Sequence, residues 1–64
     1  MAEQRWTEEE KLACLRRELK QREYVYPRRV EAGKMSRPKM EEELSCLRAI
    51  IADYENRAQS ERLL

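Results

Sequence analysis

The second half of the chain carries an apolar pattern that few folds can accommodate. Six apolar residues recur there at alternating spacings of four and three, with mostly charged and polar residues between them. This spacing marks one face of an α-helix over nearly three heptads. The residues are Met40, Leu44, Leu47, Ile51, Tyr54 and Ala58. The pattern predicts a second helix, helix two, over about residues 37–60.

The first half carries a weaker form of the pattern behind a helix-start signal. Thr7 stands three residues before Glu10, the spacing of a capping box. Pro27 cannot donate a backbone hydrogen bond, which leaves open a kinked helix or a break followed by a short separate piece. We expect a kinked helix one over about residues 8–32. Its apolar residues are Leu12, Leu15, Leu19 and Tyr26.

A short connection separates the two predicted helices. Gly33 suits the left-handed conformation that ends many helices, and Ser36 is a good N-cap for the next one. Helices joined by so short a connection lie antiparallel to each other. The predicted fold class is therefore all-α, with residues 1–64 forming a single domain, a two-helix antiparallel hairpin.

A hairpin of 64 residues is too small to bury much apolar surface alone. We use the term seam for the apolar stripe of each helix. In a single hairpin we expect each seam to remain exposed to water on one side, which favours two hairpins packed into a four-helix bundle. The predicted core of this homodimer is Leu12, Leu15, Leu19, Met40, Leu44, Leu47, Ile51 and Tyr54.

Composition argues against several classes of protein. The 14 basic and 13 acidic residues give a net charge of +1, and there is no His. Cys14 and Cys46 are too few for a zinc site, and a hairpin holds them too far apart for a disulfide. Without a Gly-rich phosphate loop or room for a pocket, we expect no enzyme, no cofactor and no metal. No apolar run could span a bilayer and no signal peptide is visible, so a cytoplasmic protein without membrane contact is expected.

Aromatic and arginine residues are the candidate anchors for a protein partner. Trp6 precedes the first cap and lacks an apolar residue to staple against. The run from Tyr24 to Tyr26 covers more than one helical face, so at least one side chain points away from the seam. Alternatively, Trp6 folds over the bundle end and the tyrosine run widens the seam. The predicted partner-binding residues are Trp6, Tyr24, Tyr26, Arg28 and Arg29, residue types that dominate interface hot spots.

The segment Arg28–Lys39 is strongly basic. Five basic residues and one acidic residue give it a local charge of +4. With tyrosines beside it, the segment has the composition of a nucleic-acid site. The negative end of the first helix dipole also explains the basic residues, and a helix-turn-helix would need a third helix. Nucleic acid is therefore the less favoured partner.

The central part of the chain resembles a family of small proteins encoded by bacteriophages and prophages of Gram-negative bacteria. Their pattern is V-Y-P-R-x-V-x-x-G-K/R-M-S, then a second helix with E-I/L-x-x-M-x-A-I-x-x-D-Y. The resemblance covers about residues 12–55 and rests on Tyr26-Pro27-Arg28-Arg29-Val30-Glu31-Ala32-Gly33-Lys34-Met35-Ser36, followed by Glu43, Leu44, Leu47, Ala49, Ile50, Asp53 and Tyr54. Met40 and Leu47 stand where relatives have Ala and Met, and both keep the seam apolar.

The resemblance implies a phage protein that binds and inhibits a host bacterial protein. One type with similar architecture, a dimeric two-helix hairpin, is an anti-activator in quorum sensing. The resemblance to this type implies a LuxR-type transcription factor or a pilus assembly ATPase as the target. Three alternatives stay open. The chain could be a nucleic-acid-binding accessory protein that uses the segment Arg28–Lys39, which we call the hinge. It could also be an oligomerisation module of a larger phage complex, or a protein that sequesters a small anionic signalling molecule at the hinge.

Overall fold

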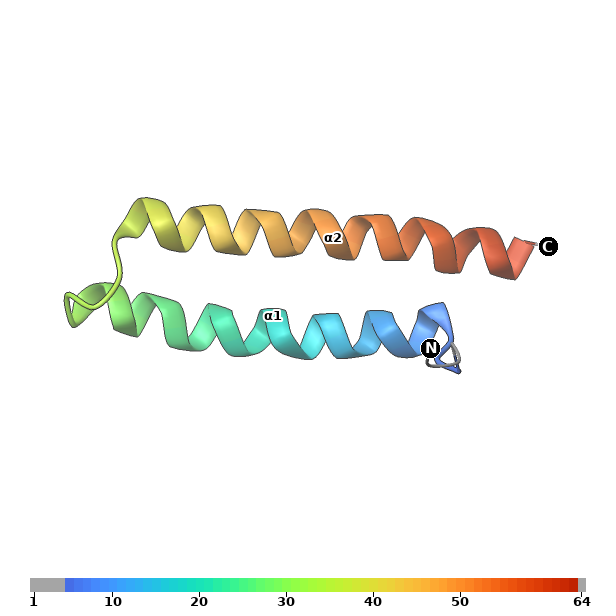
Figure 1. The fold of residues 1–64 in the computed structure, drawn as a ribbon, viewed down its shortest axis with the longest axis horizontal. Coiled ribbons are helices and arrows are strands. Elements are labelled where there is room, and N and C mark those ends of the chain that lie inside the picture. Colours follow the sequence, from blue (N-terminus) through green and yellow to red (C-terminus); the bar gives the residue numbers. More distant parts are fainter. Residues whose placement is uncertain (1–4, 64) are drawn as a thin grey trace.

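The computed structural model describes residues 5–63, with side chains through residue 60, as two helices joined by a short turn. Helix α1 spans Glu8–Glu31 and helix α2 spans Arg37–Leu63. Figure 1 shows the two helices lying antiparallel along an elongated molecule with extents of 47 × 25 × 18 Å. The described residues contain no strand, so the predicted all-α hairpin is confirmed. Helix α2 continues past residue 60, where helix two was expected to end.

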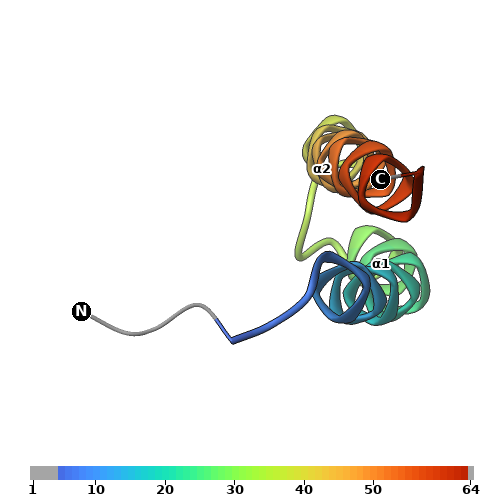
Figure 2. The same cartoon turned by 90° about the vertical axis from the view of Figure 1, so that its right-hand side faces the viewer.

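Thr7 and Glu10 determine where α1 begins. The Thr7 hydroxyl accepts a hydrogen bond from the Glu10 amide at 3.0 Å, and Glu10 Oε1 accepts one from the Thr7 amide at 2.9 Å. These two bonds satisfy amides that the start of a helix leaves unpaired. The predicted capping box is confirmed. Figure 2 shows residues 5–7 leading away from the helix pair, on the side where the connection between the helices also projects.

The hinge includes the end of α1. The helix runs through Pro27 as one element, so the separate short piece considered above does not form. Gly33 has φ of 74°, the left-handed conformation predicted for it. Its amide bonds the Val30 carbonyl at 3.0 Å, and the Lys34 amide bonds the Arg29 carbonyl at 2.8 Å. This pair of bonds is the Schellman arrangement, which satisfies carbonyls that the helix end leaves free.

Ser36 caps the start of α2, as predicted. Its hydroxyl accepts a hydrogen bond from the Lys39 amide at 3.2 Å, and its carbonyl accepts one from the Met40 amide at 3.0 Å. The side chain therefore caps the first turn of α2. Hydrogen bonds therefore satisfy free backbone groups at the end of α1 and at the start of α2. The turn between the helices is specified by interactions between residues close together in sequence.

The conformation of Gly33 leads to the first prediction. A Cβ at this position would meet no atom within 4 Å, so a substitution is opposed only by the backbone conformation. We expect Gly33→Ala to lower the free energy of unfolding by about 1 kcal/mol. In a chain of this size, the thermal midpoint should then fall by roughly 4–8 °C. Thermal unfolding followed by far-ultraviolet circular dichroism measures the shift.

Gly33→Asn is the matched control, because Asn adopts the left-handed conformation more readily than Ala. It should lose less stability than Gly33→Ala. Equal midpoints for the wild type and Gly33→Ala would show that the left-handed turn contributes nothing to the hairpin.

The apolar faces of α1 and α2 pack against each other along the hairpin. A buried cluster forms between the two helices, with Leu15, Leu19 and Tyr54 packed against it and partly exposed. Burying each Leu or Ile side chain of this cluster contributes about 1.5–3 kcal/mol. The cluster consists of Leu12, Leu47, Ile51 and Ala58, and Met40 and Leu44 are also buried, closer to the hinge.

This packing changes the role expected for the seam. The expected homodimer rests on the assumption that a single hairpin leaves the seam in water and that a second hairpin covers it. That assumption is wrong for five of the eight residues in the predicted dimer core, because they are buried within one chain. They are Leu12, Met40, Leu44, Leu47 and Ile51. A second copy would therefore have to contact apolar surface that the hairpin leaves open.

Candidate protein-interaction surfaces

Two ion pairs close one edge of the contact between α1 and α2. Arg16 Nη2 donates to Glu55 at 2.8 Å, and Arg48 Nη2 donates to Glu23 at 2.9 Å. On each helix the two participating residues are seven positions apart, so both pairs lie on the same edge, two turns from each other. These side chains are roughly half exposed, and such pairs contribute about 1 kcal/mol or less. They make this edge of the hairpin charged.

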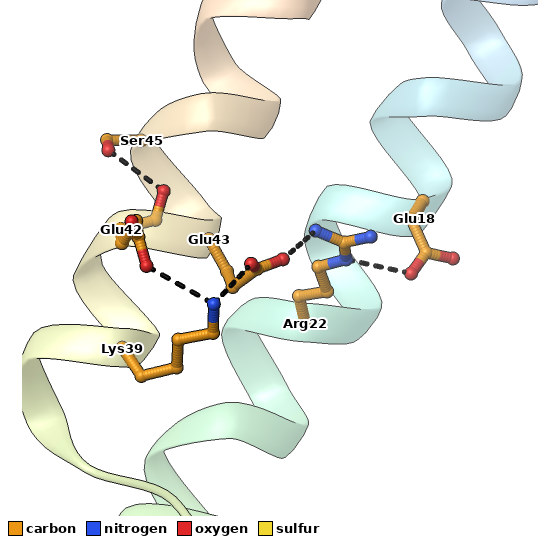
Figure 3. Close-up of polar contacts among 6 residues, drawn as sticks. All are labelled: Glu18, Arg22, Lys39, Glu42, Glu43 and Ser45. Atoms are coloured by element: carbon orange, nitrogen blue, oxygen red, sulfur yellow. Dashed lines mark hydrogen bonds and ion pairs between the residues drawn. The ribbon is translucent and has the colours of Figure 1, made fainter.

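The opposite edge is bridged near the hinge. Successive residues of a helix are rotated by about 100° around its axis. Arg22 and Glu23, three and four residues after Leu19, therefore lie on either side of the direction in which Leu19 faces α2. Arg22 therefore lies on the other edge, where it reaches Glu43 of α2 at 3.6 Å. Its Nε also donates to Glu18 at 3.0 Å. Figure 3 shows this contact between the helices.

Lys39 extends the same network. Its ammonium group contacts Glu42 at 3.2 Å and Glu43 at 3.3 Å. The hydrogen bonds to these carboxylates raise the pKa of Lys39, and the hydrogen bond to Glu18 raises the pKa of Arg22. These cations are therefore engaged by neighbours within the chain, which leaves them less available to an outside anion.

Two turns further from the hinge, the second edge is open and apolar. Leu15 is seven residues before Arg22, and Ile50 is seven residues after Glu43, so both face this edge. A groove of about 610 Å³ lies there. Its apolar lining is Trp6, Ala13, Cys14, Leu15, Ile50 and Tyr54, and its charged rim is Glu10, Lys11 and Arg17. An apolar groove with a charged rim has the character of a protein-binding surface.

Trp6 lies at this groove with half of its side chain in solvent. Its exposed fraction is 53%, and that of Ile50 across the groove is 39%. The Arg5 guanidinium carbon lies 4.7 Å from the Trp6 ring centroid, within cation–π range. The ring is therefore accessible from solvent, as its lack of a stapling partner predicts.

Tyr24 forms a separate exposed feature on α1. Its side chain is 63% exposed, which confirms that one member of the tyrosine run points away from the seam. The Arg28 guanidinium carbon lies 4.1 Å from the Tyr24 ring centroid. Tyr26 is half-buried, with Arg22 at 5.7 Å from its ring. The Tyr24–Arg28 pair thus presents a ring and a cation together.

The predicted partner-binding residues form two surfaces rather than one. Trp6 and Tyr24 are 18 residues apart in sequence, a separation of roughly 25 Å along a helix at 1.5 Å per residue. Trp6 belongs to the groove near the chain ends. Tyr24, Arg28 and Arg29 lie near the hinge.

The hinge also carries cations that form no ion pair with any described residue. In contrast to Lys39, the side chains of Arg29, Lys34 and Arg37 are exposed and form no ion pair within the described residues. Their charges are therefore open to a partner.

Sequence reasoning did not predict the groove. The sequence predicts Leu15 and Tyr54 in a dimer core, and Ile50 only widens the apolar stripe of helix two on one side. Ala13 and Cys14 carried no signal, because small residues at intermediate helical positions are common. Cys14 and Cys46 are both free, exposed thiols. The available signal was Ile50, an aliphatic residue directly beside the seam residue Ile51.

Two structural findings bear on function class. Within residues 5–63, no group of three or more His, Cys, Asp and Glu side chains could hold a metal ion. In the same part of the chain, neither helix is long and apolar enough to cross a bilayer.

Comparison of the chain with known protein families, with curated proteins and with solved structures finds no match. The two surfaces that the hairpin presents are the features that bear on its function.

Proposed function

We propose that this chain acts by binding another protein, without catalysis, and that its partner is a host bacterial protein which it inhibits. The observation that carries the proposal is the Tyr24–Arg28 pair. Tyr24 is the most exposed large hydrophobic side chain described, and Arg28 is stacked 4.1 Å from its ring. A ring and a guanidinium held together on a helix lose little conformational freedom when a partner binds. Tyr and Arg are also enriched in interface hot spots.

The class of partner follows from the resemblance to phage and prophage proteins. A phage accessory protein of this kind would act on a regulator or a machine of its bacterial host. A LuxR-type transcription factor and a pilus assembly ATPase are the specific targets that the anti-activator type suggests. Both are proteins, in agreement with a surface that combines an aromatic ring with cations.

Self-association is part of this proposal. The chain has 42% charged residues and a core supplied by only two helices. Small domains of this kind gain stability from oligomerisation. The groove offers Ile50 and Trp6, which are exposed in the single hairpin. We propose a homodimer in which four helices share this apolar surface.

Affinity capture from bacterial lysate at about 0.15 M ionic strength tests the proposed function. The tagged protein should retain a discrete host protein after nuclease treatment. Tyr24→Ala should lose most of that protein, since truncating a hot-spot residue costs about 2 kcal/mol or more, roughly a thirtyfold loss of affinity. The control is Lys20→Ala, because Lys20 is exposed on α1 one turn before Tyr24 and should leave capture unchanged. Undiminished capture by Tyr24→Ala would exclude this surface as the binding site.

Nucleic acid is the second candidate partner, favoured by Arg29, Lys34 and Arg37 at the hinge, which form no ion pair within the described residues. If nuclease treatment removes the captured material, binding should also fall steeply as salt rises. Exchange of Arg29, Lys34 and Arg37 for Glu should then abolish it. In that outcome, Tyr24→Ala would have a smaller effect than the charge exchange.

A further inference from the structure

We propose that two copies of this chain pair groove to groove in an antiparallel sense, with their hinges pointing in opposite directions. The inference rests on the proposed self-association and adds which surface joins the copies and how they are oriented. Its consequence is a bivalent protein with one Tyr24–Arg28 surface toward each end.

The groove is the apolar surface best suited to a second copy. The seam between α1 and α2 is already covered within the chain. One edge of the hairpin is charged through the Arg16–Glu55 and Glu23–Arg48 pairs. The groove edge exposes Ile50 and half-buries Leu15. A two-fold contact places the same patch on both sides, so one apolar groove covers the other.

Charge on the groove rim specifies a register for this contact. The part of α1 that lines the groove runs from Glu10 to Arg17, and its centre falls at Ala13 and Cys14. A two-fold axis at this centre brings Glu10 of each copy opposite Arg17 of the other. Arg17 forms no ion pair within the described residues, and Glu10 uses only Oε1 in the capping box. The small Ala13 side chain allows the two α1 helices to approach closely.

The charge of the hinge half selects the antiparallel orientation. Residues 20–48 hold eight basic and five acidic residues, a net charge of +3. A two-fold axis along the helices would place two such halves side by side. An axis across the helices at Cys14 separates the two hinges by roughly 55 Å, at 1.5 Å per residue. That distance is far beyond the Debye length of about 8 Å, so their mutual repulsion is screened.

This arrangement gives the dimer two binding sites for the proposed partner. The two Tyr24 side chains would lie roughly 30 Å apart along the long axis, again at 1.5 Å per residue. A partner that is itself a dimer could engage both, which would raise the overall affinity without any new contact.

The two exposed thiols provide a matched pair of probes. Cys46→Ser leaves Cys14, which would lie beside the axis. Cys14→Ser leaves Cys46, which would lie roughly 35 Å from its copy, too far for a short link. We would treat each variant with a short bismaleimide and separate the products under denaturing conditions. We expect the covalent dimer to be the main product for Cys46→Ser and absent for Cys14→Ser.

Light scattering of the untreated variants makes the outcomes distinct. A dimer that crosslinks through Cys46 as well as Cys14 would overturn the antiparallel pairing and leave self-association standing. A monomeric protein would overturn both the antiparallel pairing and the proposed self-association. Affinity capture would then still decide whether the chain binds a host protein. The charge contact adds an independent readout. Arg17→Glu should weaken the dimer at least about tenfold, because it places two carboxylates opposite each other. Adding Glu10→Gln, which keeps the capping box because Gln also accepts from the Thr7 amide, should recover part of that loss. Failure of the double variant to regain affinity would exclude the Glu10–Arg17 register.

Discussion

Replacing Leu47 with Asp should abolish the folded state of the hairpin. Leu47 is 4% exposed and belongs to the cluster between α1 and α2. Removing a buried Leu side chain costs about 2–5 kcal/mol, and burying a carboxyl group without a partner costs more. A single core in a chain this small rarely supplies more than about 3–5 kcal/mol. We therefore expect loss of the helical circular dichroism signal and of cooperative thermal unfolding.

Ala49→Asp is the control for this experiment. It introduces the same charge two residues away, at an exposed position of α2. Its free energy of unfolding should stay within about 1 kcal/mol of the wild type. A Leu47→Asp variant that unfolds cooperatively near the wild-type temperature would show that the contact between α1 and α2 is not the core of the fold.

Exchange of Ile50 for Glu should separate self-association from folding. Ile50 is 39% exposed and lines the groove, whereas its neighbour Ile51 is buried in the core. The substituted chain should keep its helical signal, because the carboxylate remains accessible to water in the single hairpin. In the proposed dimer, two carboxylates would enter the contact between the grooves without partners. We expect the dissociation constant of the dimer to rise by at least about a hundredfold, or about 2.7 kcal/mol.

Analytical ultracentrifugation over a dilution series measures this change, with Ala49→Glu as the matched control. Ala49 is exposed and is not part of the groove lining, so its exchange should leave the dissociation constant within about threefold of the wild type. Equal dissociation constants for Ile50→Glu and the wild type would place the dimer contact elsewhere. In that case the groove would be free for a helix of the partner protein.

The parts of the fold that were predictable depend on neighbours in sequence. The Thr7–Glu10 capping box, the left-handed Gly33 and the Ser36 cap each involve atoms within a few residues of one another. The same holds for the apolar spacing of α2, which follows from the helical repeat. A short turn between two such helices leaves antiparallel packing as the only compact arrangement.

The candidate site was only partly predictable. Exposure of one residue in the tyrosine run followed from helical geometry, since one face cannot hold three consecutive side chains. The stacking of Arg28 on Tyr24 places residues four apart on one face, and this spacing was visible in the sequence. The separation of Trp6 from Tyr24 into two surfaces follows from their spacing of 18 residues, since a helix of that length extends over roughly 25 Å.

The role of the seam and the position of the groove were decided by tertiary structure. The sequence shows an apolar stripe on each helix, but the partner of a stripe depends on the rotation of one helix against the other. In the hairpin the stripes of α1 and α2 face each other and bury Leu12, Leu47 and Ile51 within one chain. That rotation leaves Ile50 outside the core and brings Arg16 and Arg48 to the opposite edge, where they meet Glu55 and Glu23. Helix positions and local caps are encoded by near neighbours, whereas the division into a charged edge and an apolar edge arises only when residues about 25 to 40 positions apart come into contact.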